Sequence, residues 1–213
     1  VLWSISAAIS SYNIAAAEES LYYNQPDKAR HYVEAASRWG PRSAPLPPQY
    51  EAKWRQTKLL LQGNAMDETQ KRALYDEALA FLDEAQRRQP SFSFIHNARA
   101  KLYFVAQGQG LITDGNDRAI AELDKVLKAD PLNLDARTGL ANIYLHDGEL
   151  KKAQAVLDDG LRWPRPKGQP DLDYLVLTAR VHKQLGDVAG HDQLINEALS
   201  RAKSYGLTKP AQK

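Results

Sequence analysis

A spacing of small and large residues that returns five times along the chain constrains its fold more than any other feature. In the first three copies, a small residue is followed by a large apolar residue, another small or mid-sized residue and a proline, at steps of 4, 3 and 5. Steps of three and four place side chains on one face of an α-helix, and proline ends a helix. The fourth copy ends one residue early, and the fifth lacks the proline. The copies are Ala29, Val33, Ala36 and Pro41; Ala78, Leu82, Ala85 and Pro90; Ala119, Leu123, Val126 and Pro131; Ala153, Leu157, Gly160 and Pro164; and His191, Ile195 and Ala198.

Helical periodicity extends over nearly the whole sequence, and no stretch alternates apolar and polar residues over the length of a strand. Glycine and proline gather at residues 40–48, 108–117 and 163–170, where we expect breaks. Gly148 and Gly186 lie where paired helices would turn, because glycine adopts a left-handed conformation at least cost. The pattern predicts about ten helices, at residues 3–23, 26–39, 48–62, 67–88, 92–107, 116–129, 133–146, 149–162, 171–185 and 188–205.

Residues 140–164 show the repeated unit most clearly. A first helix carries Ala141 and Tyr144, a turn follows at Gly148, and a second helix carries the copy that begins at Ala153. This unit resembles the tetratricopeptide repeat (TPR), a helix hairpin of about 34 residues. The resemblance implies an all-α, TPR-like right-handed α-solenoid of about five helix hairpins. We expect repeats near residues 10–42, 47–91, 92–132, 133–166 and 171–205, within a single domain over residues 1–213.

Three departures from the repeat pattern blur its boundaries. Ser20 and His182 stand at positions where the first helix usually has an aromatic residue. About seven extra residues precede Ala119, and we interpret residues 108–117 as a flexible insertion that could touch a partner. Around residues 47–90 the second helix fits the pattern, whereas a longer connection displaces the first.

Composition and the absence of known motifs limit the kinds of function that the chain can have. The 213 residues are 43% hydrophobic, which suffices for a sizeable core, and a formal net charge of +2 gives no bias toward nucleic acid. The absence of cysteine excludes disulfides and thiol chemistry. No phosphate-binding loop, dinucleotide fingerprint, hydrolase elbow or zinc-protease motif is present, and the five histidines lack metal-ligand spacing. We therefore expect a protein that is not an enzyme, with no catalytic residue, no metal and no cofactor. A soluble enzyme with an all-helical site is a further hypothesis without a supporting motif.

In TPR proteins the first helix of each pair lines the concave surface, so the resemblance also implies where a partner would bind. Amide side chains can hydrogen-bond a peptide backbone, cations can pair with carboxylates, and apolar side chains can anchor. Some TPR domains hold a C-terminal carboxylate with a clamp of lysine and asparagine side chains. This clamp is partly matched by Asn97, Lys101, Asn142 and Arg180, but their placement does not reproduce it. The predicted groove residues are Phe94, Asn97, Lys101, Phe104, Thr138, Asn142, Leu145, Arg180 and Lys183, with Asp135, Asp173 and Val176 at equivalent positions.

These features favour a non-catalytic scaffold that binds a protein or peptide segment in its groove. The apolar segment Val1–Ile9 is either an amphipathic first helix or the last turns of a membrane helix. The second interpretation predicts a membrane tether upstream of Val1 and a place in a bacterial cell-envelope assembly system, on the periplasmic side. An alternative is the periplasmic TPR tail of a membrane-embedded O-antigen ligase or polymerase, or of an exopolysaccharide-export protein. Basic residues near the last helix predict a solvated end, and therefore a monomer.

Overall fold

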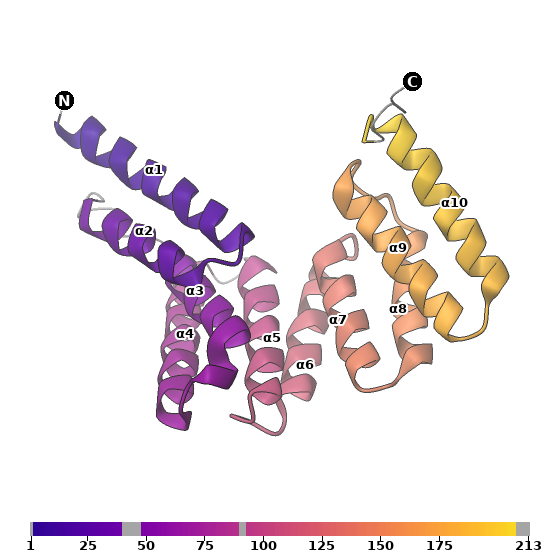
Figure 1. Cartoon of the computed structure of the whole chain (residues 1–213), viewed down its shortest axis with the longest axis horizontal. Helices are drawn as coiled ribbons and strands as arrows, with labels where there is room; N and C mark the ends of the chain where they lie inside the picture. The colour runs from indigo at the N-terminus through magenta and orange to yellow at the C-terminus, as the bar shows by residue number, and fades with distance from the viewer. Residues whose placement is uncertain (1, 40–47, 90–92, 208–213) are drawn as a thin grey trace. The chain divides into compact units, whose positions relative to one another are not determined.

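The computed structural model describes residues 2–39, 48–89 and 93–207, with side chains described for residues 9–38, 50–89 and 93–207 (Figure 1). Residues 40–47 of the predicted break at 40–48, and the prolines Pro41 and Pro90, lie outside the described residues. Within the described part, the chain forms α-helices, one short 3₁₀ turn and no strand, which confirms the all-α prediction. None of the described helices is long and apolar enough to cross a membrane.

The helices of the described residues match the predicted ones to within about two residues at their ends. They are α1 (Leu2–Tyr22), α2 (Pro26–Trp39), α3 (Pro48–Gln62), the 3₁₀ turn η1 (Gly63–Ala65), α4 (Glu68–Arg88), α5 (Ser93–Gly108), α6 (Gly115–Ala129), α7 (Leu134–His146), α8 (Leu150–Leu161), α9 (Gln169–Gln184) and α10 (Val188–Ser204).

Local side-chain chemistry explains where several helices begin and turn. Asp67 precedes α4 and accepts the backbone N–H of Gln70, whose side chain accepts the N–H of Asp67 in return. Asn133 likewise accepts a backbone N–H from the first turn of α7. These bonds satisfy amide groups that have no partner inside the helix. In the predicted turns, Gly148 and Gly186 have φ angles of 76° and 85°, which glycine adopts without strain.

The chain divides into two compact units, Val1–Glu122 and Leu123–Lys213. In the first unit, α1 packs on α2, α3 packs on α4, and α4 packs on α5. The described residues of the second copy of the repeated spacing are buried here, with Ala78, Leu82 and Ala85 at 3% exposure or less. The larger core cluster of this unit contains Ala52, Leu59, Tyr75, Ala78, Leu82, Ala85, Ile95, Leu102, Val105, Ala106 and Leu111. The repeated spacing thus marks a core face.

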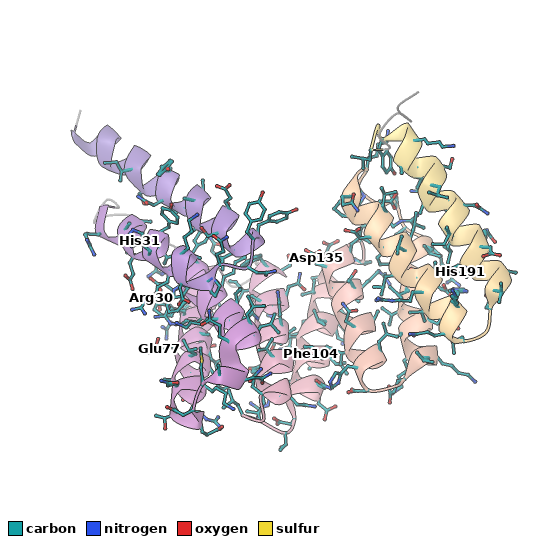
Figure 2. The ribbon with its side chains drawn as sticks, in the orientation of Figure 1. Arg30, His31, Glu77, Phe104, Asp135 and His191 are labelled. Carbon is teal, nitrogen blue, oxygen red and sulfur yellow. The ribbon has the colours of Figure 1, made fainter. Side chains whose placement is uncertain are left out.

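In the second unit, α7 pairs with α8 and α9 pairs with α10. In the fourth copy Ala153, Leu157 and Gly160 are again buried, and Leu157 belongs to a cluster with residues from α7 and α9. The fifth copy is less regular, since Leu194 and Ala198 are buried while Ile195 is half-buried. His191 lies at the partly exposed side of α10 (Figure 2).

The connection before α6 differs from the flexible insertion that its glycines predict over residues 108–117. Leu111 is 5% exposed and belongs to the core of the first unit. The Arg72 guanidinium donates to the Leu111 carbonyl at 2.6 Å, and the Gln107 side chain accepts a backbone N–H from the first turn of α6 at 2.8 Å. The connection is therefore shorter than predicted, at residues 109–114, and Leu111 anchors it to the core of the first unit.

Candidate partner-binding surface

In the first unit, α5 presents the predicted partner-binding side chains on one side while its other side packs into the core. Lys101 is exposed, and Phe94 is 36% exposed. Asn97 and Phe104 are half-buried, and Figure 2 labels Phe104 on this helix. Four residues spaced by three or four positions therefore share one partly exposed stripe, as the helical period requires.

In the second unit, α7 and α9 carry the remaining predicted residues. Asn142, Arg180 and Lys183 are exposed, and Thr138 is half-buried. Leu145 packs against the core cluster that joins α7, α8 and α9, so it supports the core as well as bordering the surface. The equivalent positions Asp135, Asp173 and Val176 are also exposed, and Figure 2 labels Asp135. Each unit therefore carries its own set of predicted binding residues. A continuous groove formed by all of them stays a prediction.

The α3 helix supplies part of this surface that the sequence pattern did not predict. It packs beside α5, and the Gln56 side-chain amide donates to the Ala98 carbonyl at 3.0 Å across the seam between the two helices. This contribution was missed from the sequence because the repeat pattern is displaced around residues 47–90. The steps of four and three between Lys53, Thr57 and Leu60 nevertheless place these side chains on one side of a helix. We define the α3–α5 face by the side chains of Lys53, Thr57, Leu60, Phe94 and Lys101.

Lys101 has unusual electrostatic surroundings for an exposed residue. Although its side chain reaches solvent, the protein around it desolvates the ammonium group, and this desolvation lowers the pKa of Lys101. The nearby positive charge of Lys53 lowers the pKa further. By contrast, Lys58 on α3 lies 2.6 Å from the carboxylate of Asp27. The α3–α5 face therefore brings two like charges together.

The surface of α4, the second helix of its pair, is an alternative binding surface for a partner protein. A shallow depression on α4 is lined by Glu68, Thr69, Arg72, Ala73 and Asp76. Because Arg72 also holds the connection at Leu111, this depression lies beside the glycine-rich segment that the sequence suggested for partner contact. It provides an alternative surface that experiments can compare with the first-helix positions.

Histidines in the described residues form pairs and bridges within the helix packing. The Nδ1 atom of His96 lies 2.6 Å from the Glu122 carboxylate in the first unit. Within the described residues, no group of three or more His, Asp or Glu side chains is arranged to hold a metal ion. The His96 contact joins α5 and α6, whereas His146 and His191 each lie beside the aspartate that follows them in the sequence.

His182 bridges three helices of the second unit. Its Nε2 atom lies 2.8 Å from Asp158 of α8, and its Nδ1 atom lies 2.7 Å from Asp187. Asp187 also accepts the Gly190 N–H at the start of α10. Burial by itself lowers the pKa of His182, but the hydrogen bonds to both aspartates outweigh burial and hold the pKa above its ordinary value.

We expect the stability of the second unit to depend on the protonation of His182. Because the folded-state pKa is raised, this stabilisation is fully present below the unfolded-state pKa and is lost as pH rises through the folded-state value. His182→Phe should lower the free energy of unfolding by about 1–2 kcal/mol at about pH 5.5 and by less at about pH 8.5. Urea unfolding followed by circular dichroism measures both values. His191→Phe is the control, since the His191 ring pairs with its sequence neighbour Asp192 on the same helix and bridges no other helix. Equal pH profiles for wild type and His182→Phe would contradict this expectation.

Comparison with known proteins identifies the repeats. Residues 116–176 match the family model described as tetratricopeptide repeat. Residues 116–176 are a tetratricopeptide repeat segment. The matched segment includes the hairpin of α7 and α8, where the spacing was clearest in the sequence. None of the curated proteins matches this TPR chain in sequence.

Solved structures of other proteins share the TPR fold. A thermophilic TPR protein of Thermus thermophilus, TTC0263, has a TM-score of 0.65 at 16% identity, over 91% of this chain and 92% of that one. MamA from Desulfovibrio magneticus RS-1 has a TM-score of 0.51 at 14% identity, over 92% and 96% of the two chains. PilW, a type IV pilus biogenesis factor, has a TM-score of 0.51 at 19% identity, over 94% and 79%. These likenesses confirm the TPR-like fold.

Proposed function

We propose that the TPR chain binds a segment of a partner protein along the exposed faces of its first helices. The observation that carries this proposal is the exposure of Lys101, Asn142, Arg180 and Lys183 on α5, α7 and α9, whose opposite sides are built into the core. Cations and amides on a rigid helical framework can recognise carboxylates and peptide groups without reorganising the fold. Neighbouring half-buried side chains would add apolar contact.

Site-specific photo-crosslinking in the source cells tests the proposal. A photoreactive amino acid replaces Asn142 or Lys183 on the first helices, and Lys151 or Gln193 on the second helices serves as the matched exposed control. We expect the first-helix positions to give about fivefold more of one covalent adduct than the controls, since contact concentrates in a central patch. A photoreactive residue at Thr69 reports on the α4 depression. An adduct formed mainly from Thr69, Lys151 or Gln193 would contradict the proposal.

A double substitution checks the same surface without a crosslinker. Lys101→Glu with Asn142→Ala changes two exposed side chains, so circular dichroism should show a folded protein. The crosslinked partner should no longer co-purify with this variant. A bacterial cell-envelope setting is a separate prediction based on the apolar segment Val1–Ile9, whose first residue lies outside the described residues. Fractionation of the source cells tests that setting.

A further inference from the structure

We propose that the α3–α5 face binds an acidic, partly apolar segment of a partner protein, with Lys53 and Lys101 paired to carboxylate side chains of that segment. This inference rests on the proposed function and specifies the partner chemistry that the first unit recognises. It concerns residues of one unit only, on two helices that pack against each other.

Helix geometry places the two lysines on the same side of the seam. The hydrogen bond from Gln56 to Ala98 marks where α3 and α5 face each other. Lys53 comes three residues before Gln56 and Lys101 comes three residues after Ala98, which are rotations of about 60° in opposite senses around the two axes. Since α4 reverses the chain between them, α3 and α5 run in roughly the same direction. Because the two helices are roughly parallel and the two rotations are opposite, Lys53 and Lys101 both lie on the same, open side of the seam.

The open side of these two helices has positive charge without a carboxylate of its own. The partly exposed stripe of α3 continues from Lys53 through Thr57 to Leu60, and the stripe of α5 holds Phe94 and Lys101. Among the described residues of α3 and α5, the single acidic side chain is Glu51, which is engaged by Arg55 at 2.6 Å. The described residues of these two helices therefore leave the two lysines without a carboxylate partner, and a bound acidic segment would supply the neutralising charge.

Crowding strengthens the preference for an anionic ligand. Desolvation and the charge of Lys53 both disfavour the protonated form of Lys101 and lower its pKa. A carboxylate bound beside the two ammonium groups offsets both effects, because opposite charge within a few ångströms favours the charged form. Charge-assisted hydrogen bonds of this kind are stronger than neutral ones, above all where solvent is partly excluded.

Apolar neighbours favour a protein segment over a nucleic acid. Leu60 is 45% exposed and Phe94 is 36% exposed, so each side of the lysine pair offers apolar surface. A peptide that alternates acidic and apolar residues can satisfy both kinds of contact at once. Nucleic acids are bound by extended basic surfaces, whereas this chain has a net charge of only +2.

Fluorescence anisotropy with defined peptides tests the inference on the full chain. The probe is a labelled peptide of alternating glutamate and leucine with both ends blocked, and its matched partner has glutamine in place of every glutamate. We expect the acidic peptide alone to bind, with an affinity that falls as salt rises from about 50 to 300 mM. Lys53→Gln with Lys101→Gln should raise the Kd about tenfold or more, which is the loss of two charge-assisted contacts.

The control variant is Lys28→Gln, which removes an exposed lysine on α2 in the same unit and should leave the Kd unchanged. Thermal unfolding of each variant checks that the lysine substitutions leave the fold intact. The inference is overturned if the acidic peptide fails to bind at about 1 mM, or if the double variant binds as tightly as wild type. Equal binding of the glutamine peptide would also overturn it.

Two further probes separate other sources of negative charge. A glutamine–leucine peptide with a free C-terminal carboxylate tests recognition of a chain end, and tighter binding of this peptide than of the acidic one would overturn the inference. A thymidine oligonucleotide bound more tightly, with the same dependence on Lys53 and Lys101, would overturn it in favour of nucleic acid. The proposed function is tested separately at Asn142 and Lys183 in the other unit. Adducts there without binding of the acidic peptide would reject the inference alone.

Discussion

Gly160→Ala should lower the free energy of unfolding by about 2–3 kcal/mol, the cost of overpacking a filled core. Gly160 lies on α8 against the fully buried Tyr174 of α9. A methyl group at this position would overlap the Tyr174 hydroxyl and would lie 2.8 Å from Cζ of the same ring and 2.9 Å from Cδ of Arg137. The ring cannot retreat without cost, because its hydroxyl donates to the Leu157 carbonyl at 2.9 Å.

Urea unfolding followed by circular dichroism measures the loss at Gly160. The control is Gly108→Ala at the end of α5, where an added methyl group meets no atom within 4 Å. This control should be neutral or slightly stabilising, since alanine favours the helix. The double variant with Tyr174→Phe should recover part of the loss, because the hydroxyl makes the closest contact. An unchanged unfolding midpoint for Gly160→Ala would show that α8 and α9 are packed less closely than the structure indicates.

Asp171→Ala should be the most destabilising single substitution in the second unit, at about 3–5 kcal/mol, since it removes one partner of a buried ion pair. The Asp171 side chain is fully buried at the start of α9. Its carboxylate accepts hydrogen bonds from Arg165 at 2.6 Å, Arg201 at 2.9 Å and the Tyr205 hydroxyl at 2.8 Å. Arg165 is itself only 4% exposed, so the variant leaves a buried charge without its main partner.

The effect of Asp171 should also depend on pH. Burial by itself raises the pKa of Asp171, but hydrogen bonds from Arg165, Tyr205 and Arg201 outweigh burial and lower the pKa. The stabilisation is therefore present above the unfolded-state pKa and is lost as pH falls through the lowered folded-state value. Unfolding of Asp171→Ala and wild type should differ strongly at about pH 7 and much less at about pH 2. Asp173→Ala, two residues along the same helix and exposed, is the control and should change stability little. A small loss at neutral pH for Asp171→Ala would contradict the expectation.

The candidate surface was predictable only in part. Exposure of Lys101, Asn142 and Arg180 follows from helical period alone, because positions three or four residues apart share a face. The position of Lys53 at this surface was not predictable, since it depends on which helix packs beside α5. Leu145 shows the opposite difficulty: its position in the repeat places it at the surface, whereas its contacts place it at the edge of the core.

The sequence by itself determined the helices, their ends to within about two residues, and the buried side of the helices that carry the repeated spacing. These features arise from residues within a few positions of one another, such as Asp67 with Gln70 and the repeated small and large residues. Only the tertiary structure decided which distant side chains meet. His182 contacts an aspartate 24 residues away, and Gln56 bonds a carbonyl 42 residues away. Such meetings depend on the packing of whole helices, for which local spacing holds no information.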